Sequence, residues 1–438
     1  MSCACAHVPE GATEGVFSVD ASSLTFGRGA IAEIGALARS LGVRRVGLFT
    51  DRGVAKLEIF ERARQALASA GIDVGVYDEV RVEPTDASFL AAARFASEGK
   101  FDGYVSVGGG SSIDTCKAAL LSATFPGDLM TWFNRPVGAG TPIPGPLPPH
   151  IACPTTSGTG SELTGIAVCD VLALHAKTGI ASRRLRPTLA VIDPDATDTL
   201  PASVVAASGF DVLCHALESF TARPFSSRPL SIDPLQRPMS QGQNPWSDLG
   251  SREALRLGAK YLVRAVNDAT DTVAREQIMW AATLAGLAFG NAGVHLPHAM
   301  AYAVAGQVKE FRMPGYPDAE PMVPHGISVV ASAPEAFRFT APAGAPRHLE
   351  SAVLLGASPD VLHDAAPTAA GDVLAGALER LMRDAHVPVG LRALGYAADD
   401  ISALVAGTIV QKRLLDNAPC PIAEADLDAV FRAAVSRA

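Results

Sequence analysis

One carboxylate and three imidazoles in this sequence are spaced so that they could bind a metal ion. Asp211 and His215 are four residues apart in the Ala/Leu-rich stretch 206–220, so a helix there places both on one face. A charged Asp in such an apolar helix is costly unless a cation compensates it. His298 and His325 each follow a proline, which favours the first turn of a helix. The four residues predict a site for Fe²⁺ or Zn²⁺, with core packing of the histidines as the competing interpretation.

A glycine-rich turn predicts a second kind of site. Residues 104–117 run from a strand-like stretch through three glycines and two serines into a helix-like stretch. Glycines let the backbone approach a pyrophosphate closely, and the N–H groups at a helix start donate to it. A second Gly/Ser/Thr loop, 154–162, follows another apolar strand and could bind the same phosphates. The candidate cofactor-binding residues of the two loops are Gly108, Gly109, Gly110, Ser111, Ser112, Asp114, Thr155, Thr156, Ser157 and Thr159.

Asp51 follows the strand-like stretch 43–50. An acid at this place can accept a hydrogen bond from the adenosine ribose and repel a 2′-phosphate, which favours NAD over NADP. A helix N-cap is the alternative role for this carboxylate.

The elements that must position these residues fall into two classes. The first half alternates β-branched runs with Ala/Leu-rich stretches, which is typical of a parallel sheet with flanking helices. From about Pro201 onward only helical patterns follow. We therefore expect a flexible tail over 1–20, an α/β nucleotide-binding domain over 21–198 and a helical metal-binding domain over 199–438. The expected strands are 43–50, 72–77, 103–108, 150–153 and 188–192, the expected helices in this half are 54–70 and 86–99, and the expected long loops are 136–149 and 223–250.

Composition excludes several classes of protein. The formal charge is −9 and neither end carries a basic block, so nucleic acid is not an expected partner. No stretch is long and apolar enough for a membrane span. The first basic residue is Arg28, which does not fit a secretion or transit signal, so we expect a cytoplasmic protein. The seven scattered cysteines predict buried thiols; Cys3, Cys5 and His7 could bind a metal only as a minor alternative.

The motifs GGGSSIDTCK, PTTSGTGSE, GFDVLCHALE, VHLPHAMAY and VPHG, in this order, resemble the iron-containing alcohol dehydrogenase family over roughly residues 20–420. The resemblance implies a Rossmann-like N-terminal domain and an all-α C-terminal domain, a dehydroquinate synthase-like architecture. It also implies NAD and a divalent metal, Fe²⁺ before Zn²⁺, on Asp211, His215, His298 and His325.

A narrower resemblance, to the hydroxyacid–oxoacid transhydrogenase branch, rests on EPTD at 83–86, AKTGIAS at 176–182, RPMSQGQNPWSD at 237–248 and GNAGVHLPHAMAY at 290–302. It implies hydride transfer from a hydroxy acid, such as 4-hydroxybutyrate or 3-hydroxybutyrate, to 2-oxoglutarate through bound NAD. Many family members have a proton-carrying His four residues after the third ligand, where this chain has Tyr302. Tyr302 and His295 are therefore the candidate catalytic residues, with packing as the alternative for both.

Other functions remain open from the sequence. The first alternative is an alcohol or aldehyde dehydrogenase of the same family that uses free NAD, the second a polyol dehydrogenase, and the third a non-enzymatic nucleotide-binding protein. Acidic substrates require a cation, and the candidates are Arg183, Arg223, Lys309 and Arg312. The resemblance also implies a homo-oligomer, and the eukaryotic relatives of the branch are mitochondrial.

Overall fold

A parallel sheet of six strands forms one half of the protein in a computed structural model that describes residues 11–174, 176–231, 233–234, 237–316 and 321–437. Its strand order is β1-β8-β5-β4-β2-β3, and every neighbouring pair is parallel. The strands are β1 (Ser23–Phe26), β2 (Arg45–Phe49), β3 (Asp73–Tyr77), β4 (Gly103–Gly108), β5 (His150–Pro154) and β8 (Leu189–Ile192).

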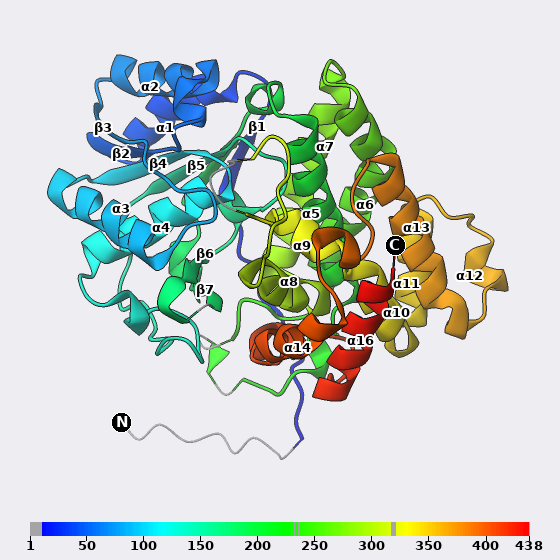
Figure 1. Cartoon of the computed structure of the whole chain (residues 1–438). Coiled ribbons are helices and arrows are strands. Elements are labelled where there is room, and N and C mark those ends of the chain that lie inside the picture. The colour runs from blue at the N-terminus through cyan, green and yellow to red at the C-terminus, as the bar shows by residue number, and fades with distance from the viewer. Residues whose placement is uncertain (1–10, 175, 232, 235–236, 317–320, 438) are drawn as a thin grey trace.

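Helices cover both faces of this sheet (Figure 1). On one face α1 (Ile34–Ser40) and α2 (Glu58–Ser69) pack on Leu48 and Val105. On the other face α3 (Asp86–Gly99) and α4 (Gly110–Thr124) pack on Phe49 and Tyr104. Successive side chains of a strand point to opposite faces, and the central strands β4 and β5 are buried throughout, so both faces of the sheet are covered. The expected α/β architecture is confirmed.

Two features of this half are absent from the sequence-based expectation. β1 is a short strand that pairs with β8. Strands β6 (Ile166–Val171) and β7 (Ala176–Ala181) form a separate antiparallel pair and not part of the parallel sheet. They lie between β5 and β8 in the sequence and below the main sheet in Figure 1.

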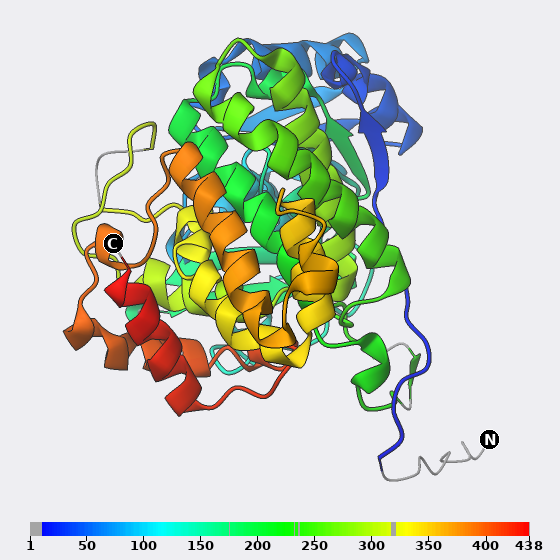
Figure 2. The same ribbon diagram turned by 90° about the vertical axis from the view of Figure 1, so that its right-hand side faces the viewer.

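The second half is helical throughout the described part of the chain after Ile192 (Figure 2). Helix α5 is buried along most of its length and contacts α6, α7 and α9, so it forms the centre of this half. The helices are α5 (Ala202–Thr221), α6 (Pro245–Asn267), α7 (Thr272–Ala292), α8 (Leu296–Gly306), α9 (His325–Val330), α10 (Ala333–Thr340), α11 (Ala345–Leu354), α12 (Val361–Asp364), α13 (Ala370–Asp384), α14 (Ile401–Ile409), α15 (Lys412–Leu415) and α16 (Glu424–Ser436). The exact domain boundary near residue 198 stays a prediction.

The expected loop over 223–250 ends earlier than expected. Helix α6 begins at Pro245, and the side chain of Asn244 accepts a hydrogen bond from the Ser247 N–H at 3.0 Å. Proline at the first helical position and asparagine before it are favourable start signals, so the last six residues of the expected loop are helical. The loop over 136–149 carries no helix or strand.

Residues 11–20, expected to belong to a flexible tail, make specific contacts with the helical half. The Glu14 carboxylate pairs with Arg237 at 3.2 Å. The Ser18 N–H donates to the Gln241 side chain at 2.8 Å, and the Asp20 N–H donates to Asn291 at 2.8 Å. This segment therefore lies along α7 and the loop before α6. Cys3, Cys5 and His7 lie outside the described residues.

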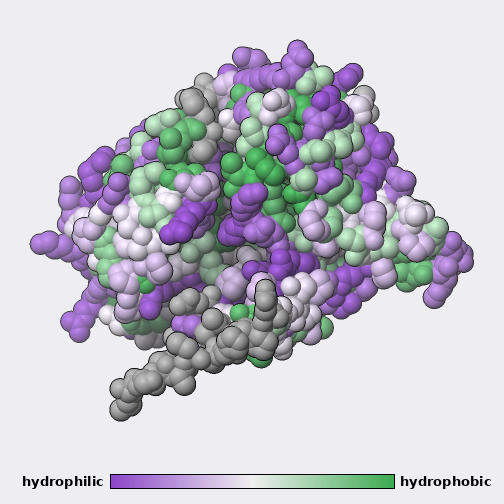
Figure 3. Space-filling model, turned by 90° about the horizontal axis from the view of Figure 1, so that it is seen from below, coloured by the Kyte–Doolittle hydropathy of each residue, from purple (hydrophilic) through white to green (hydrophobic). Residues whose placement is uncertain are grey.

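The described cysteines are free thiols, as expected from the sequence. Cys116, Cys153, Cys169 and Cys214 are buried free thiols and Cys420 is partly buried. In the described part of the chain, no helix combines the length and the apolar character that a membrane crossing requires. Hydrophilic side chains predominate along the margins of the face shown in Figure 3.

Candidate active site

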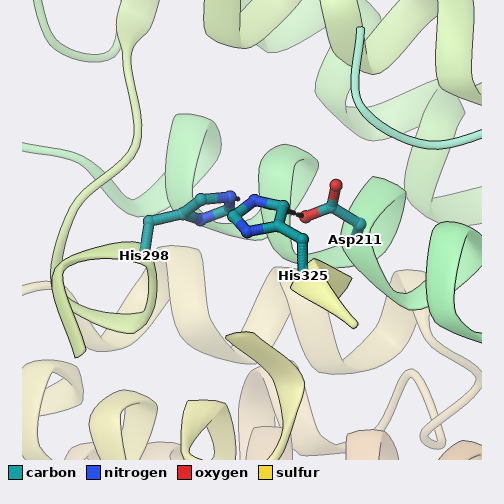
Figure 4. Close-up of side chains that lie close together, drawn as sticks. All are labelled: Asp211, His298 and His325. Atoms are coloured by element: carbon teal, nitrogen blue, oxygen red, sulfur yellow. Dashed lines mark ion pairs between the residues drawn. The ribbon is translucent and has the colours of Figure 1, made fainter. Parts of the chain in front are cut away.

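Three of the four predicted metal ligands meet in the helical half. The ligand atoms of Asp211, His298 and His325 lie within 4.8 Å of one another, and their side chains point toward each other (Figure 4). The Asp211 Oδ1 atom lies 3.5 Å from His298 Nε2 and 3.7 Å from His325 Nε2. His215 is outside this tight group, but its Nε2 also lies 3.7 Å from Asp211 Oδ1.

Three helices carry this acid–imidazole cluster. Asp211 and His215 lie one turn apart on α5, His298 is in the first turn of α8, and His325 is the first residue of α9. Both helix starts next to the prolines agree with the sequence-based expectation. Gly326 lets α9 touch α5, because a Cβ atom there would lie 1.9 Å from the Ala207 carbonyl oxygen.

Two further contacts orient the imidazoles. The ring of His215 stacks on Phe289 with centroids 3.9 Å apart. The fully buried Glu218 lies two turns after Asp211 on α5, and its Oε1 atom is 2.5 Å from His298 Nδ1. An Nδ1–H that donates to this carboxylate leaves the Nε2 lone pair facing Asp211, which is the arrangement that metal-binding histidines use. Glu218 was not among the predicted site residues.

The electrostatics of the cluster fit a bound cation. Asp211 Oδ1 and His298 Nε2 are buried and have no hydrogen-bond partner among the described residues. Burial lowers the pKa of His215 to about 4 and also lowers that of His325, so both imidazoles are neutral at pH 7. Burial opposes charge on His298 as well, but Glu218 and Asp211 raise its pKa to about 10. The two carboxylates thus stabilise a positive charge at this point, which a divalent metal would supply.

The spacing within the cluster also fits a tetrahedral metal site. Metal–ligand bonds of 2.0–2.1 Å place neighbouring ligand atoms about 3.4 Å apart in a tetrahedron. The three distances from Asp211 Oδ1 to the imidazoles are 3.5, 3.7 and 3.7 Å. The donor set therefore fits Fe²⁺ or Zn²⁺, as the sequence suggested.

The nucleotide-site candidates lie at the carboxyl ends of β2 and β4. The chain runs from β2 outward to β3 and then crosses back to β4 on the other side of β2, so the strand order reverses between β2 and β4. Ligands of open α/β sheets bind in the crevice at such a point. Asp51 follows β2 and lines a cavity of about 600 Å³. Its Oδ1 atom accepts from the N–H groups of Gly53 and Val54, so the capping role that the sequence left open is present.

The glycine-rich turn opens a second cavity, of about 140 Å³, at the start of α4. Because α4 begins at Gly110, its first N–H groups have no acceptor within the helix and face this end. The cavity is lined by Gly110, Ser111, Asp114 and Thr159 from the two loops and by His215, His298 and His325 from the cluster. It shares Glu83 and Lys177 with the cavity at Asp51, so the two are neighbours.

Three other predicted nucleotide-site residues are buried. Ser112, Thr155 and Ser157 are buried, and the Ser157 hydroxyl contacts the Met279 sulfur at 3.2 Å. Gly108 accepts from the Thr155 N–H, which joins the two loops. Asp114 accepts hydrogen bonds from the Ser161 hydroxyl and from the Val168 N–H at 2.9 Å. Gly109 lies next to Thr156 of the second loop. A Cβ atom on Gly109 would lie 3.4 Å from the Thr156 side chain.

The two candidate proton carriers differ in position. Tyr302 on α8 lines the same cavity as His298. Its burial raises the pKa of its hydroxyl, and Arg413 counteracts that effect. His295 does not line the cavity: its Nε2 atom is 3.0 Å from the Thr221 hydroxyl, and its ring is fully buried against Phe337. The geometry favours packing for His295 and a role at the site for Tyr302.

None of the four predicted substrate-binding cations lines the cavity at the cluster. Arg183 pairs with Asp20, Arg223 donates to the Asp416 carbonyl, and Lys309 pairs with Asp400. The cations that do line this cavity are Lys177 on β7 and Arg413 on α15. Lys177 lies in the motif AKTGIAS at 176–182, but neither residue was among the predicted substrate-binding cations.

Comparisons with known proteins agree with this geometry. A sequence model described as "Iron-containing alcohol dehydrogenase" matches residues 21–194, and one described as "Fe-containing alcohol dehydrogenase family, C-terminal" matches residues 238–435. The chain is 48% identical to the "Hydroxyacid-oxoacid transhydrogenase, mitochondrial" of Rattus norvegicus, over 97% of this chain and 90% of that protein.

Two solved structures have the same architecture. The crystal structure of a 1,3-propanediol oxidoreductase superposes with a TM-score of 0.83 at 28% identity, covering 96% of this chain and all of that one. Sulfoacetaldehyde reductase from Bifidobacterium kashiwanohense, solved in complex with NAD⁺, superposes with a TM-score of 0.77 at 25% identity, covering 96% of this chain and 99% of that one.

Proposed function

Because this chain belongs to the iron-containing alcohol dehydrogenase family, and is therefore an oxidoreductase, we propose that it is a hydroxyacid–oxoacid transhydrogenase. One observation supports this function above others: the acid–imidazole cluster and the start of α4 open on a single cavity. In the proposed reaction a hydride passes from the carbinol carbon of 4-hydroxybutyrate to bound NAD⁺, and the hydroxyl proton leaves. The hydride then passes to the keto carbon of 2-oxoglutarate, which takes up a proton and becomes 2-hydroxyglutarate.

The residues proposed to hold the metal are Asp211, His215, His298 and His325. A divalent metal there would polarise the substrate oxygen and lower the pKa of the alcohol. Glu218 keeps the His298 ring oriented, and the stacked Phe289 does the same for His215. Tyr302 lines the same cavity as His298 and His325 and is proposed to relay the proton of the substrate hydroxyl.

The residues proposed to hold the nucleotide lie along the two neighbouring cavities. The first N–H groups of α4 would bind the pyrophosphate and Asp51 the adenosine ribose. NAD supplies the hydride acceptor. The proposed location is the cytoplasm, the proposed partners are small hydroxy and oxo acids only, and the proposed assembly is a homo-oligomer.

A two-substrate assay tests the transhydrogenase function. Purified enzyme is given 4-hydroxybutyrate with and without 2-oxoglutarate, and no NAD is added. We expect 2-hydroxyglutarate and the aldehyde of 4-hydroxybutyrate in equal amounts, and only when both acids are present. Release of NADH with simple alcohols, and no dependence on 2-oxoglutarate, would instead identify an alcohol dehydrogenase that uses free NAD.

The choice of NAD over NADP is tested at Asp51. We expect Asp51→Gly to bind NADP more tightly, by roughly tenfold relative to NAD, because a carboxylate that repels the 2′-phosphate is gone. Titration calorimetry with both nucleotides measures the ratio. Asp73→Gly, at an exposed acid on β3, is the control. An unchanged ratio in Asp51→Gly leaves that carboxylate with its capping role alone.

A further inference from the structure

The lining of the cluster cavity also includes an arginine and a serine hydroxyl. Arg413 of α15 and Ser240 of the loop before α6 line the cavity together with His298, His325 and Tyr302. The Arg413 guanidinium donates to the Ser240 hydroxyl at 3.5 Å. Neither residue belongs to the proposed metal or nucleotide sites.

Charge balance distinguishes Arg413 from the other cation of this cavity. Lys177 is nearly fully buried, and its ammonium lies 2.7 Å from Glu83 and 3.3 Å from Asp170. Its charge is therefore already compensated by two carboxylates. Arg413 is exposed to the cavity and to solvent, and no carboxylate of the described residues lies within 4.0 Å of its guanidinium. An anion that enters this cavity thus meets one uncompensated cation.

The backbone around Ser240 holds the hydroxyl at this place. The N–H groups of Gln241 and Gly242 donate to the carbonyl oxygens of Asn291 and Ala292, each at 2.9 Å. Gly293, with a φ of 85°, brings the end of α7 so close that a Cβ there would lie 2.8 Å from Ser240 Oγ. The loop is therefore fixed against the end of α7 directly beside the cluster.

We propose that Arg413 and the Ser240 hydroxyl bind the substrate carboxylate that lies farthest from the reacting carbon. Arginine offers two parallel N–H donors that match the two oxygens of a carboxylate, and the serine O–H adds a third donor. This assignment rests on the proposed function, since it names the group that selects acids over neutral alcohols at the same site.

The chemistry of the two proposed substrates supports a single shared anion site. In 4-hydroxybutyrate two methylene groups separate the carbinol carbon from the carboxylate. In 2-oxoglutarate two methylene groups also separate the keto carbon from the distal carboxylate. A carboxylate held by Arg413 therefore places the reacting carbon of either acid at the same distance along the cavity. One site then serves the donor and the acceptor in turn.

Binding of glutarate tests the anion site without any hydride transfer. Glutarate has the carbon chain of 2-oxoglutarate and no keto group, so its affinity reports on carboxylate recognition alone. Titration calorimetry on the metal-loaded protein should show that Arg413→Met weakens glutarate binding roughly 10- to 100-fold, the range for lost hydrogen bonds to a charged group. The glutarate affinity of Arg413→Lys should lie between those of the wild type and Arg413→Met. Ser240→Ala should lose less glutarate affinity than Arg413→Met.

Lys412→Met is the matched control, because it removes a positive charge from the neighbouring residue, which lines only the adjoining cavity. Its glutarate affinity should equal that of the wild type. Glutarate that does not bind the wild type, or that binds Arg413→Met equally well, overturns the proposal. So does an equal loss in Lys412→Met, which would indicate a general effect of surface charge.

Steady-state kinetics separate this proposal from the proposed function. If both hold, Arg413→Met raises the KM for 4-hydroxybutyrate and leaves that for 1,4-butanediol, its neutral analogue, unchanged. The variant should also lose discrimination between 2-oxoglutarate and 2-oxoadipate, which is one methylene longer. Wild-type transhydrogenation with an unchanged KM in Arg413→Met overturns the anion site and leaves the function intact. Wild-type protein that binds glutarate through Arg413 but transfers no hydride overturns the function alone.

Discussion

At the residue scale, the metal affinity of the cluster depends on a side chain that is not itself a proposed ligand. Glu218 holds the Nδ1 side of His298, so the Nε2 lone pair faces Asp211. We expect Glu218→Gln to lower Fe²⁺ or Zn²⁺ affinity about 10- to 100-fold, the usual loss when such a supporting carboxylate is removed. Competition with a coloured chelator measures it.

Glu379→Gln is the control for this change. Glu379 is a buried carboxylate on α13 that pairs with Arg338 and does not contact the cluster. Metal affinity in this control should equal that of the wild type. Wild-type affinity in Glu218→Gln would show that packing of α8 alone orients His298.

Tyr302 gives the second prediction at this scale. Burial raises the pKa of its hydroxyl, so the proton stays on the oxygen at neutral pH and can be donated or relayed. We expect Tyr302→Phe to lower turnover about 100-fold at pH 7, the lower range for loss of a proton-transferring group. Tyr261→Phe, on the surface-facing α6 beside Arg264, is the control and should keep its turnover. Wild-type turnover in Tyr302→Phe removes this residue from the proton path.

Single residues also show what the sequence could and could not predict of the site. The four-residue spacing of Asp211 and His215 is a local signal, and the helix α5 places both as expected. Glu218 contacts His298, which is 80 residues away in the sequence, and Arg413 lines the same cavity as His298 from even farther along the chain. A local sequence pattern does not predict contacts between residues so far apart. The spacing of His295 from His298 does not reveal that its ring bonds to Thr221 and is absent from the cavity lining, so the geometry favours packing for this candidate.

At the element scale, the short helix α9 depends on a glycine contact with α5. Gly326 lies against the Ala207 carbonyl, and a methyl group there would overlap it. Gly326→Ala should therefore push α9 and His325 away from Asp211. We expect a loss of about 2 kcal/mol in the free energy of unfolding, typical of overpacking, together with weaker metal binding. Urea unfolding and chelator competition measure the two effects.

Gly376→Ala is the matched control at this scale. Gly376 lies inside α13, and a Cβ there would meet no atom within 4 Å. Replacing a helical glycine by alanine should stabilise the fold by about 1 kcal/mol and leave metal affinity unchanged. If Gly326→Ala changes the free energy of unfolding and the metal affinity no differently from Gly376→Ala, the close contact of Gly326 with α5 does not have the proposed role.

Elements with strong local signals were predicted well, and others were not. The observed bounds of α3 and β4 equal the expected ranges 86–99 and 103–108. The β6–β7 pair was missed because its connection, 172–175, contains no Gly, Pro, Asn or Asp, so the usual hairpin signature is absent. β1 was missed because it has only four residues and its partner β8 is far away in the sequence.

At the scale of the whole molecule, buried neutral histidines in both halves make stability depend on pH. Burial lowers the pKa of His150 to about 3 and the pKa values of His295 and His348 to about 4. These folded-state values lie below the unfolded value of about 6.5, so their contribution is complete above pH 6.5. It is lost as the pH falls from 6.5 toward 4, by about 1.4 kcal/mol per pH unit for each histidine.

His348→Gln tests this dependence. Its ring bonds to the Thr340 hydroxyl at 3.0 Å and to the Gly344 carbonyl at 2.9 Å, away from the metal cluster. We expect the free energy of unfolding of this variant to fall less between pH 6.5 and 5.5 than that of the wild type, by about 1 kcal/mol. Urea titrations at both pH values measure the slope. The exposed His363→Gln should keep the wild-type slope, and an equal slope in His348→Gln would contradict the expectation.

The contacts of residues 11–20 have a practical consequence for anyone who expresses this enzyme. Glu14 forms an ion pair with Arg237, and the Ser18 backbone hydrogen-bonds to the Gln241 side chain. Ser240 lies between Arg237 and Gln241 in the sequence. If the loop at Ser240 selects acids as proposed, removal of residues 11–20 should loosen this loop, because these contacts would be lost. We expect such a shortened protein to bind its metal and its nucleotide and to lose its preference for acids over neutral alcohols.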